Sequence, residues 1–102
     1  MLKQNLPISA IVPCKCSVNE LAPLLFALCE GNAWPSELLI VDAGLQLINH
    51  SDEYSSLLLS LHPDFASIVR VLPQNQSLYP GEARNQGCQE ALSPWIAFVD
   101  VN

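Results

Sequence analysis

The stretch Glu37–Asp42 reads ELLIVD, and it indicates the fold class of the whole chain. Between its two acidic ends the stretch is apolar at every position, without the alternation of a strand that has one face in water. Uninterrupted apolar strands are typical of a parallel sheet that is covered by helices on both faces. Because Ala43 and Gly44 follow directly, we expect a fully apolar strand that ends in the Asp42 carboxylate at a turn.

Further strands and helices are expected on both sides of this stretch. The expected strands are Ile8–Pro13, Ile68–Leu72 and Trp95–Val99. The expected helices run from about Val18 until Gly31-Asn32 ends the first, from Glu53 to Leu61 and from about Gly81 to Leu92. The order β-α-β-α-β-α-β with right-handed crossovers predicts an α/β fold: an open, mainly parallel sheet with helices on both faces.

The start of the first helix has two possible descriptions. Ser17 and Glu20 have the spacing of a capping box, which places the first helical residue at Val18. Pro23 then lies deep for a helix that begins there, because proline lacks a backbone N–H. Either the helix starts nearer Asn19 or its first turn is kinked.

Length and charge limit the class of protein. The chain has 102 residues, with 4 Lys and Arg against 10 Asp and Glu, and a formal net charge of −6. This length accommodates one small domain. The acidic balance argues against nucleic acid as a partner, because nucleic-acid binding requires a basic surface that neutralises phosphates. With 50% hydrophobic and 14% charged residues, the composition is the reverse of that of a disordered chain.

The sequence also carries signals about compartment. Met1–Pro7 lacks the apolar run of a signal peptide, and the longest apolar stretch, Leu21–Cys29, is far shorter than the roughly 20 residues of a membrane span. We therefore expect no transmembrane segment and a cytoplasmic location. For a full-length protein, peripheral attachment to the inner face of a membrane is the alternative. Reduced thiols are expected there at Cys14, Cys16, Cys29 and Cys88. A metal or redox site at Cys14-Lys15-Cys16 is the alternative, although no second ligand pair for zinc is present.

The expected carboxyl ends of the strands carry the polar residues of greatest interest. In open α/β sheets, ligands bind outside these ends. They carry Pro13-Cys14-Lys15, Asp42-Ala43-Gly44 and Asp100-Val101-Asn102. Two carboxylates that arrive independently at one edge exceed what the fold requires, so a ligand site is expected there. Elsewhere, Trp34 and Trp95 are expected in the core, and His50 and His62 at the surface.

Four segments resemble a known family. They are ISAIVP with NELAPLL (residues 8–13 and 19–25), AWPSELLIVDAG (33–44), GEARNQG (81–87) and WIAFVDVN (95–102). The segments are similar, in this order, to the opening strand and helix, the D-D-G-S strand, the A-x-A-R-N-x-G helix start and the D-x-D strand of family 2 glycosyltransferases. The last two segments together make the resemblance specific. It implies the N-terminal, nucleotide-sugar-binding half of the GT-A fold over residues 1–102, truncated at the D-x-D-like motif.

The resemblance implies a donor site with a divalent cation, Mn²⁺ or Mg²⁺, that bridges carboxylates and the donor diphosphate. Asp100 is the carboxylate of the D-x-D motif here. The last position of the motif is Asn102, whose amide oxygen binds a metal without adding charge. Pro13, Lys15, Asp42 and Arg84 are the further candidates for binding the nucleotide sugar.

Several of these candidates have a second interpretation. Asp42 is either a nucleoside contact or a turn-former, and the base-holding Asp that often follows it is Ala43 here. Lys15 is either a phosphate contact or a solvated side chain. Arg84, near a helix start, suits a phosphate or a carboxylate, or it pairs with Glu82 or with the acidic strand ends.

No catalytic residue is expected within the chain. By the resemblance, the acceptor site and the catalytic base, usually acidic, belong to a second half beyond Asn102. The full-length enzyme would transfer a sugar from a nucleotide-diphosphate donor to the hydroxyl of an unknown acceptor. The alternative is a non-catalytic GT-A-like module that serves in assembly. Because Trp95–Val99 is expected at an open sheet edge, we also expect the fragment to form a homo-oligomer.

Overall fold

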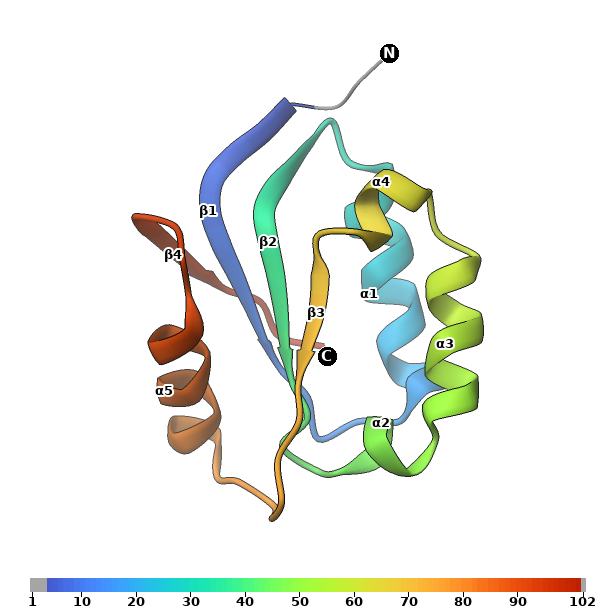
Figure 1. The fold of residues 1–102 in the computed structure, drawn as a ribbon, viewed down its shortest axis with the longest axis vertical. Coiled ribbons are helices and arrows are strands. Elements are labelled where there is room, and N and C mark those ends of the chain that lie inside the picture. The colour runs from blue at the N-terminus through green and yellow to red at the C-terminus, as the bar shows by residue number, and fades with distance from the viewer. Residues whose placement is uncertain (1–3, 102) are drawn as a thin grey trace.

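The protein folds into three layers, with a parallel sheet between helix α5 (Pro80–Glu90) on one face and the remaining helices on the other (Figure 1). The structure is a computed structural model that describes residues 4–101. Its strands are β1 (Gln4–Pro13), β2 (Ala33–Val41), β3 (Val69–Leu72) and β4 (Trp95–Phe98). Its helices are α1 (Val18–Glu30), α2 (Gln46–Asn49), α3 (Ser51–Leu59), α4 (Pro63–Ala66) and α5 (Pro80–Glu90). The predicted α/β fold with helices on both faces is confirmed.

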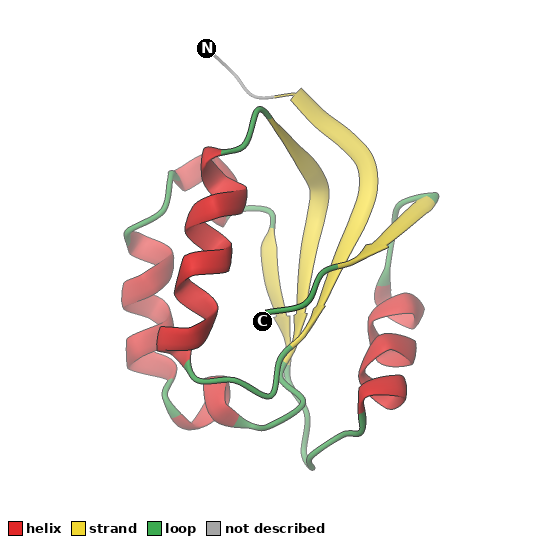
Figure 2. Cartoon of the chain, turned by 180° about the vertical axis from the view of Figure 1, so that it is seen from behind, coloured by secondary structure: helices red, strands yellow, loops and turns green. Residues whose placement is uncertain are grey.

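The sheet has the strand order β3-β2-β1-β4, and all of its pairs are parallel. Successive residues of a strand point to opposite faces, so the apolar strands build two cores at once. On β2, Leu39 and Val41 pack in the cluster beneath α5. Leu38 and Ile40 pack in the cluster beneath α1 and α3. Figure 2 shows the same layers from behind, with α5 separated from the other helices by the sheet.

Helix α1 begins at Val18, which decides between the two descriptions of its start. The Ser17 side chain accepts a hydrogen bond from the backbone N–H of Glu20 at 3.2 Å, and the Glu20 carboxylate accepts one from the Ser17 N–H at 3.2 Å. This capping box satisfies two of the amide groups that a helix start leaves free. Pro23 lies inside the helix, where it removes the one N–H that would donate to the carbonyl of Asn19.

Two short helices, α2 and α4, are absent from the sequence-based description, and β1 and β2 each begin four residues earlier than expected. Helix α4 brings Phe65 against Trp34, with ring centroids 5.4 Å apart. Trp34 is buried, as predicted, and its indole N–H donates to the carbonyl of Cys29. Both histidines are exposed, which confirms their predicted surface positions.

The prediction of a buried Trp95 is wrong, because this side chain is 68% exposed. Trp95 begins β4, the edge strand, which pairs with β1 on one side only. Ile96 and Phe98 on the same strand are also exposed. An apolar sequence alone does not distinguish a strand covered on both sides from one at an uncovered edge.

A cluster of polar contacts anchors the chain between α5 and β4 to the amino end of the sheet. The Glu37 carboxylate accepts hydrogen bonds from the Ser9 hydroxyl and from the backbone N–H of Leu92, both at 2.6 Å. The Ser9 hydroxyl in turn accepts from the N–H of Ser93. Arg70 lies 3.8 Å from the same carboxylate. These contacts fix where β4 enters the sheet.

Within residues 4–101, no helix is long and apolar enough to cross a membrane.

Candidate functional site

The strand order creates a crevice between the carboxyl ends of β1 and β4. The chain leaves β1 toward α1 on one face of the sheet, and it reaches β4 from α5 on the other face. Ligands of open α/β sheets bind at such a switch point, outside the carboxyl ends of the strands. A pocket of about 370 Å³ lies there, within the range of small-molecule sites.

Four of the six predicted site residues line this pocket: Pro13, Lys15, Arg84 and Asp100. They come from the end of β1, the start of α5 and the end of β4, so segments far apart in the sequence meet in one place. Asp42 does not line the pocket. Asn102, the sixth, lies outside the described residues.

Arg84 and Asp100 face each other across the pocket. Nη2 of Arg84 lies 3.9 Å from Oδ1 of Asp100, and the side chains are 42% and 71% exposed. The guanidinium also lies 5.9 Å from the ring centroid of Phe98. Of the structural partners foreseen for Arg84, the structure contains the strand-end carboxylate rather than Glu82. The Glu82 carboxylate accepts instead from the N–H of Tyr79 at 2.8 Å.

Helix α5 can present Arg84 to the pocket because it packs very close to β1. A Cβ atom built on Gly87 would lie 2.4 Å from Cγ2 of Ile11, closer than real Cβ contacts allow. Ala83, one position before Arg84, is fully buried in the cluster with Ile11. The glycine at residue 87 therefore sets the distance between the helix and the sheet, and with it the position of the guanidinium.

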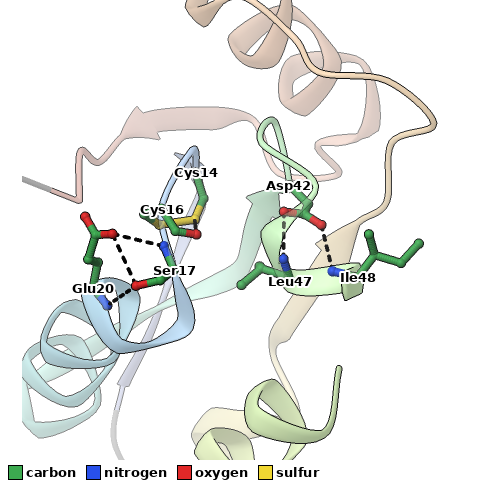
Figure 3. Close-up of a disulfide and its surroundings, with 7 residues drawn as sticks. All are labelled: Cys14, Cys16, Ser17, Glu20, Asp42, Leu47 and Ile48. Carbon is green, nitrogen blue, oxygen red and sulfur yellow. Dashed lines mark hydrogen bonds between the residues drawn. A yellow bond between two sulfur atoms is a disulfide. The ribbon is translucent and has the colours of Figure 1, made fainter. Parts of the chain in front are cut away.

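Lys15 lies on the loop between β1 and α1, where its ammonium group is 5.8 Å from the ring centroid of Tyr79. A disulfide joins its two neighbours, Cys14 and Cys16 (Figure 3). The prediction of reduced thiols is thus wrong for this pair and confirmed for Cys29 and Cys88, which are free. The compartment argument could not detect the bridge, because it depends on two side chains that the local backbone turns to the same side.

Asp42 is fully buried, and its carboxylate points toward α2 (Figure 3). Oδ1 accepts a hydrogen bond from the N–H of Leu47 at 3.1 Å, and Oδ2 accepts from the N–H of Ile48 at 2.9 Å. These amides belong to the first turn of α2, where backbone donors have no partner within the helix. The geometry matches the turn-forming alternative for Asp42.

The pocket collects positive charge from a chain that has little of it. Three basic side chains are described, and two of them, Lys15 and Arg84, line the pocket. They balance the two acidic lining residues, Glu20 and Asp100. Pro80 also lines the pocket, so the N-terminal end of α5, the positive end of its dipole, opens there. This surrounding suits an anion even though the net charge is −6.

Sequence reasoning missed several lining residues. Cys16 and Glu20 belong to the loop and first turn after β1, and Leu78, Pro80 and Ala83 belong to the approach and start of α5. The capping-box spacing located Glu20 at a helix start but gave no sign of a pocket. The position of Leu78 follows from a backbone hydrogen bond, its N–H to the carbonyl of Ala43 at 2.9 Å, which no local pattern predicts.

The donor set for a cation is small. Within residues 4–101, no three His, Cys, Asp or Glu side chains gather as a metal site. Asp100 offers one exposed carboxylate at the pocket. Mg²⁺ commonly takes one or two carboxylates together with substrate phosphates and waters. The described residues therefore fit a divalent cation in company with a diphosphate, and not one held by the protein alone.

The match to a family model covers almost all of these elements. The model for glycosyl transferase family 2 matches residues 9–101, from within β1 to the residue after Asp100. The chain belongs to glycosyl transferase family 2. No curated protein matches the chain. For this family 2 domain, the parallel sheet with helices on both faces agrees with a Rossmann-like half of the GT-A fold.

Proposed function

We propose that this domain is the donor-binding part of a nucleotide-sugar-dependent glycosyltransferase, and that the pocket between β1 and β4 holds the donor diphosphate. The observation that carries the proposal is the meeting of Lys15, Arg84 and Asp100 at the switch point of an acidic chain. Family membership supports the reaction class.

Each lining residue has a role in this proposal. Lys15 and Arg84 attract the diphosphate, and the first turn of α5 offers backbone N–H groups to its oxygens. Pro13 ends β1 and shapes the floor of the pocket. Asp42 acts through structure, because it holds the turn after β2 on which Ala43 reaches the pocket.

Asp100 and Asn102 would hold Mn²⁺ or Mg²⁺ jointly with the diphosphate. When bound, the cation would stabilise the negative charge that develops on the departing diphosphate. Arg84 would then have two roles: it pairs with Asp100 in the domain without ligand, and it would contact a phosphate of the donor.

Titration calorimetry with UDP and with GDP tests the proposal, in the presence and absence of Mn²⁺. We expect weak binding that requires the cation, loss of binding in Asp100→Ala, and at least tenfold weaker binding in Arg84→Gln, since a charge-assisted hydrogen bond is lost. The matched control for Asp100→Ala is Asp52→Ala, which changes the net charge equally away from the pocket. Binding that ignores both Mn²⁺ and Asp100→Ala contradicts the site.

A non-catalytic GT-A-like assembly module is the second candidate. The observation that favours it is the small donor set: Asp100 is paired with Arg84, the Glu20 carboxylate caps α1, and Ala43 stands in place of a base-holding Asp. Absence of nucleotide binding under every condition, in a chain that remains folded, would support this module against the enzyme.

We place the domain, residues 1–102, in the N-terminal half of a GT-A glycosyltransferase, with a cytoplasmic location. We further propose that it self-associates through the unpaired edge of β4, the strand that also carries the exposed side chains of Trp95, Ile96 and Phe98. Pairing with a second copy would cover both the apolar side chains and the free backbone groups. Sedimentation should show a dimer at high micromolar concentration and a monomer for Ile96→Lys; a clean wild-type monomer contradicts this part.

A further inference from the structure

The Cys14–Cys16 disulfide forms part of the pocket wall, and the donor chemistry proposed above does not use it. Cys16 lines the pocket next to Lys15 and is 6% exposed, Cys14 is fully buried, and both belong to the core cluster beneath α1. Figure 3 shows the bridge directly before Ser17, the N-cap of α1. The bridge therefore lies between the strand that ends at the pocket and the helix that leaves it.

The bridge controls the backbone on both sides of Lys15. It holds the Cα atoms of Cys14 and Cys16 5.2 Å apart, whereas an extended chain separates such residues by roughly 6.6–7.2 Å. Gly44 packs against the resulting bend, since a Cβ atom there would lie 3.1 Å from Cα of Lys15. On the outer side, the ammonium group lies over Tyr79. Lys15 thus lies between Gly44 and Tyr79, at a bend whose two ends the bridge joins.

We propose that the Cys14–Cys16 pair is a reversible redox switch that sets the position of Lys15 and hence the affinity of the pocket for a nucleoside diphosphate. This inference rests on the proposed function. A dithiol supplies the two electrons: its thiolate attacks Sγ of Cys16, and Cys14 leaves as a thiolate that takes up a proton. The second thiol of the reductant then attacks the mixed disulfide, which releases Cys16 as a thiol and the reductant as a cyclic disulfide.

Reduction changes the loop and leaves the domain folded. The bridge spans a sequence separation of 2, and the stabilisation that a disulfide gives grows with the loop it closes. Backbone contacts independent of the bridge hold the same segment: the N–H of Cys14 donates to the carbonyl of Val41, and the N–H of Gly44 donates to the carbonyl of Cys14. In a compartment that keeps thiols reduced, a disulfide that does form is usually transient and regulatory.

The ligand and the bridge affect each other equally. A diphosphate in the pocket would lie against Cys16, the one of the two cysteines that lines the pocket. If oxidation tightens binding by a given factor, bound ligand makes the bridge harder to reduce by the same factor. A tenfold effect on affinity corresponds to a shift of about 30 mV in the reduction potential.

The experiment uses a Cys29→Ser/Cys88→Ser background, so that only the pair responds to dithiothreitol. UDP with Mn²⁺ is titrated into the oxidised and the reduced protein. We expect the oxidised form to bind about tenfold more tightly, the scale of one charged contact. Additional Cys14→Ser and Cys16→Ser substitutions should give the affinity of the reduced form with no response to dithiothreitol. Equal affinity in the two redox states overturns the switch.

Lys15→Ala tests how the switch acts. In this variant both redox states should bind UDP with the weaker affinity, and a redox effect that persists overturns the role of Lys15. If UDP binds neither state of the parent protein, the proposed function fails and amide NMR decides the switch. Shifts on reduction that reach Gly44 and Tyr79 then support it, and shifts confined to residues 14–16 overturn it.

Discussion

The segments that follow β2 and β4 end in an aspartate at the same edge of the sheet, but the two carboxylates have opposite surroundings. Asp42 is fully buried, and each of its oxygens accepts a backbone N–H. Asp100 is 71% exposed, and Arg84 is 3.9 Å away. A carboxylate whose oxygens are all satisfied within the fold determines shape. One that retains free oxygens at a pocket remains available to a ligand.

The course of the chain after each strand explains the difference. After β2 the chain turns at once into α2, whose first amides require an acceptor, and Asp42 supplies it. After β4 no helix begins within the described residues, so no backbone donor competes for Asp100. The comparison predicts that the two residues separate stability from binding.

Asp42→Ala should produce the largest change in stability. Two buried amides lose their acceptor and a small void remains, so we expect the free energy of unfolding to fall by about 3 kcal/mol. Urea denaturation measures this value. Asp100→Ala, the matched control at the exposed strand end, should change it by no more than about 0.5 kcal/mol. Similar losses in the two variants would contradict the assignment of separate roles.

Gly87→Ala should affect both properties together. The added methyl group forces α5 away from Ile11, which we expect to cost about 1–3 kcal/mol in stability and to move Arg84 from the pocket. Gly81→Ala is the control in the same helix, because a Cβ atom there meets nothing within 4 Å. Thermal unfolding and UDP titration give the two measurements. A stable Gly87→Ala variant with normal binding would contradict the close packing of α5.

Asn102→Asp tests, through ligand affinity, whether carboxylates after β4 serve in binding. A second carboxylate after β4 adds charge toward a cation, so Mn²⁺-dependent UDP binding should become about tenfold tighter. Calorimetry with and without Mn²⁺ measures the change. Asn32→Asp, which adds the same charge at the amino end of β2, should leave the affinity unchanged. Equal gains in both variants would indicate a general charge effect.

Tyr54 provides a third, smaller case: a polar group that is buried without a partner. Its hydroxyl is the buried side-chain group within residues 4–101 that has no hydrogen-bond partner, and burial raises its pKa from 10.0 to about 12. The folded state holds this proton more strongly than the unfolded chain does. The free energy of unfolding is therefore unaffected by this titration below pH 10, and it declines as the pH rises toward 12. Tyr54→Phe should raise stability by about 1 kcal/mol at neutral pH.

The same variant should remove that part of the pH dependence. Urea denaturation between pH 8 and 11.5 compares the two proteins, and Tyr79→Phe is the control, since Tyr79 is exposed. An unchanged decline in stability for Tyr54→Phe would assign the effect to other groups.

The sequence was sufficient for the features that depend on strand direction. Four mainly apolar stretches, among which Leu38–Val41 is uninterrupted, predicted a parallel sheet, and a parallel sheet brings all carboxyl ends to one edge. For this reason Pro13, Lys15 and Asp100 could be placed near each other without a structure. Arg84 lies near a helix start, and it became a candidate through the family resemblance.

The features that depend on a single tertiary contact could not be predicted. The burial of Asp42 depends on α2, a four-residue helix whose N-cap is Leu45 in the left-handed region with φ 61°, a conformation that leucine rarely adopts. No cap or turn signal in the sequence marks it. The exposure of Trp95 depends on the absence of a neighbour beyond β4, which the residues of β4 do not encode.

The strand order also has a consequence during synthesis. The strand made first, β1, receives its second neighbour, β4, last. Because β4 begins 23 residues after β3 ends, a ribosome needs roughly 1–5 s to supply it. For that time the nascent chain presents the unpaired edge of Ile8–Ile11 to other chains and to chaperones. Slower translation of residues 73–94 prolongs this exposure without altering any contact of the finished fold.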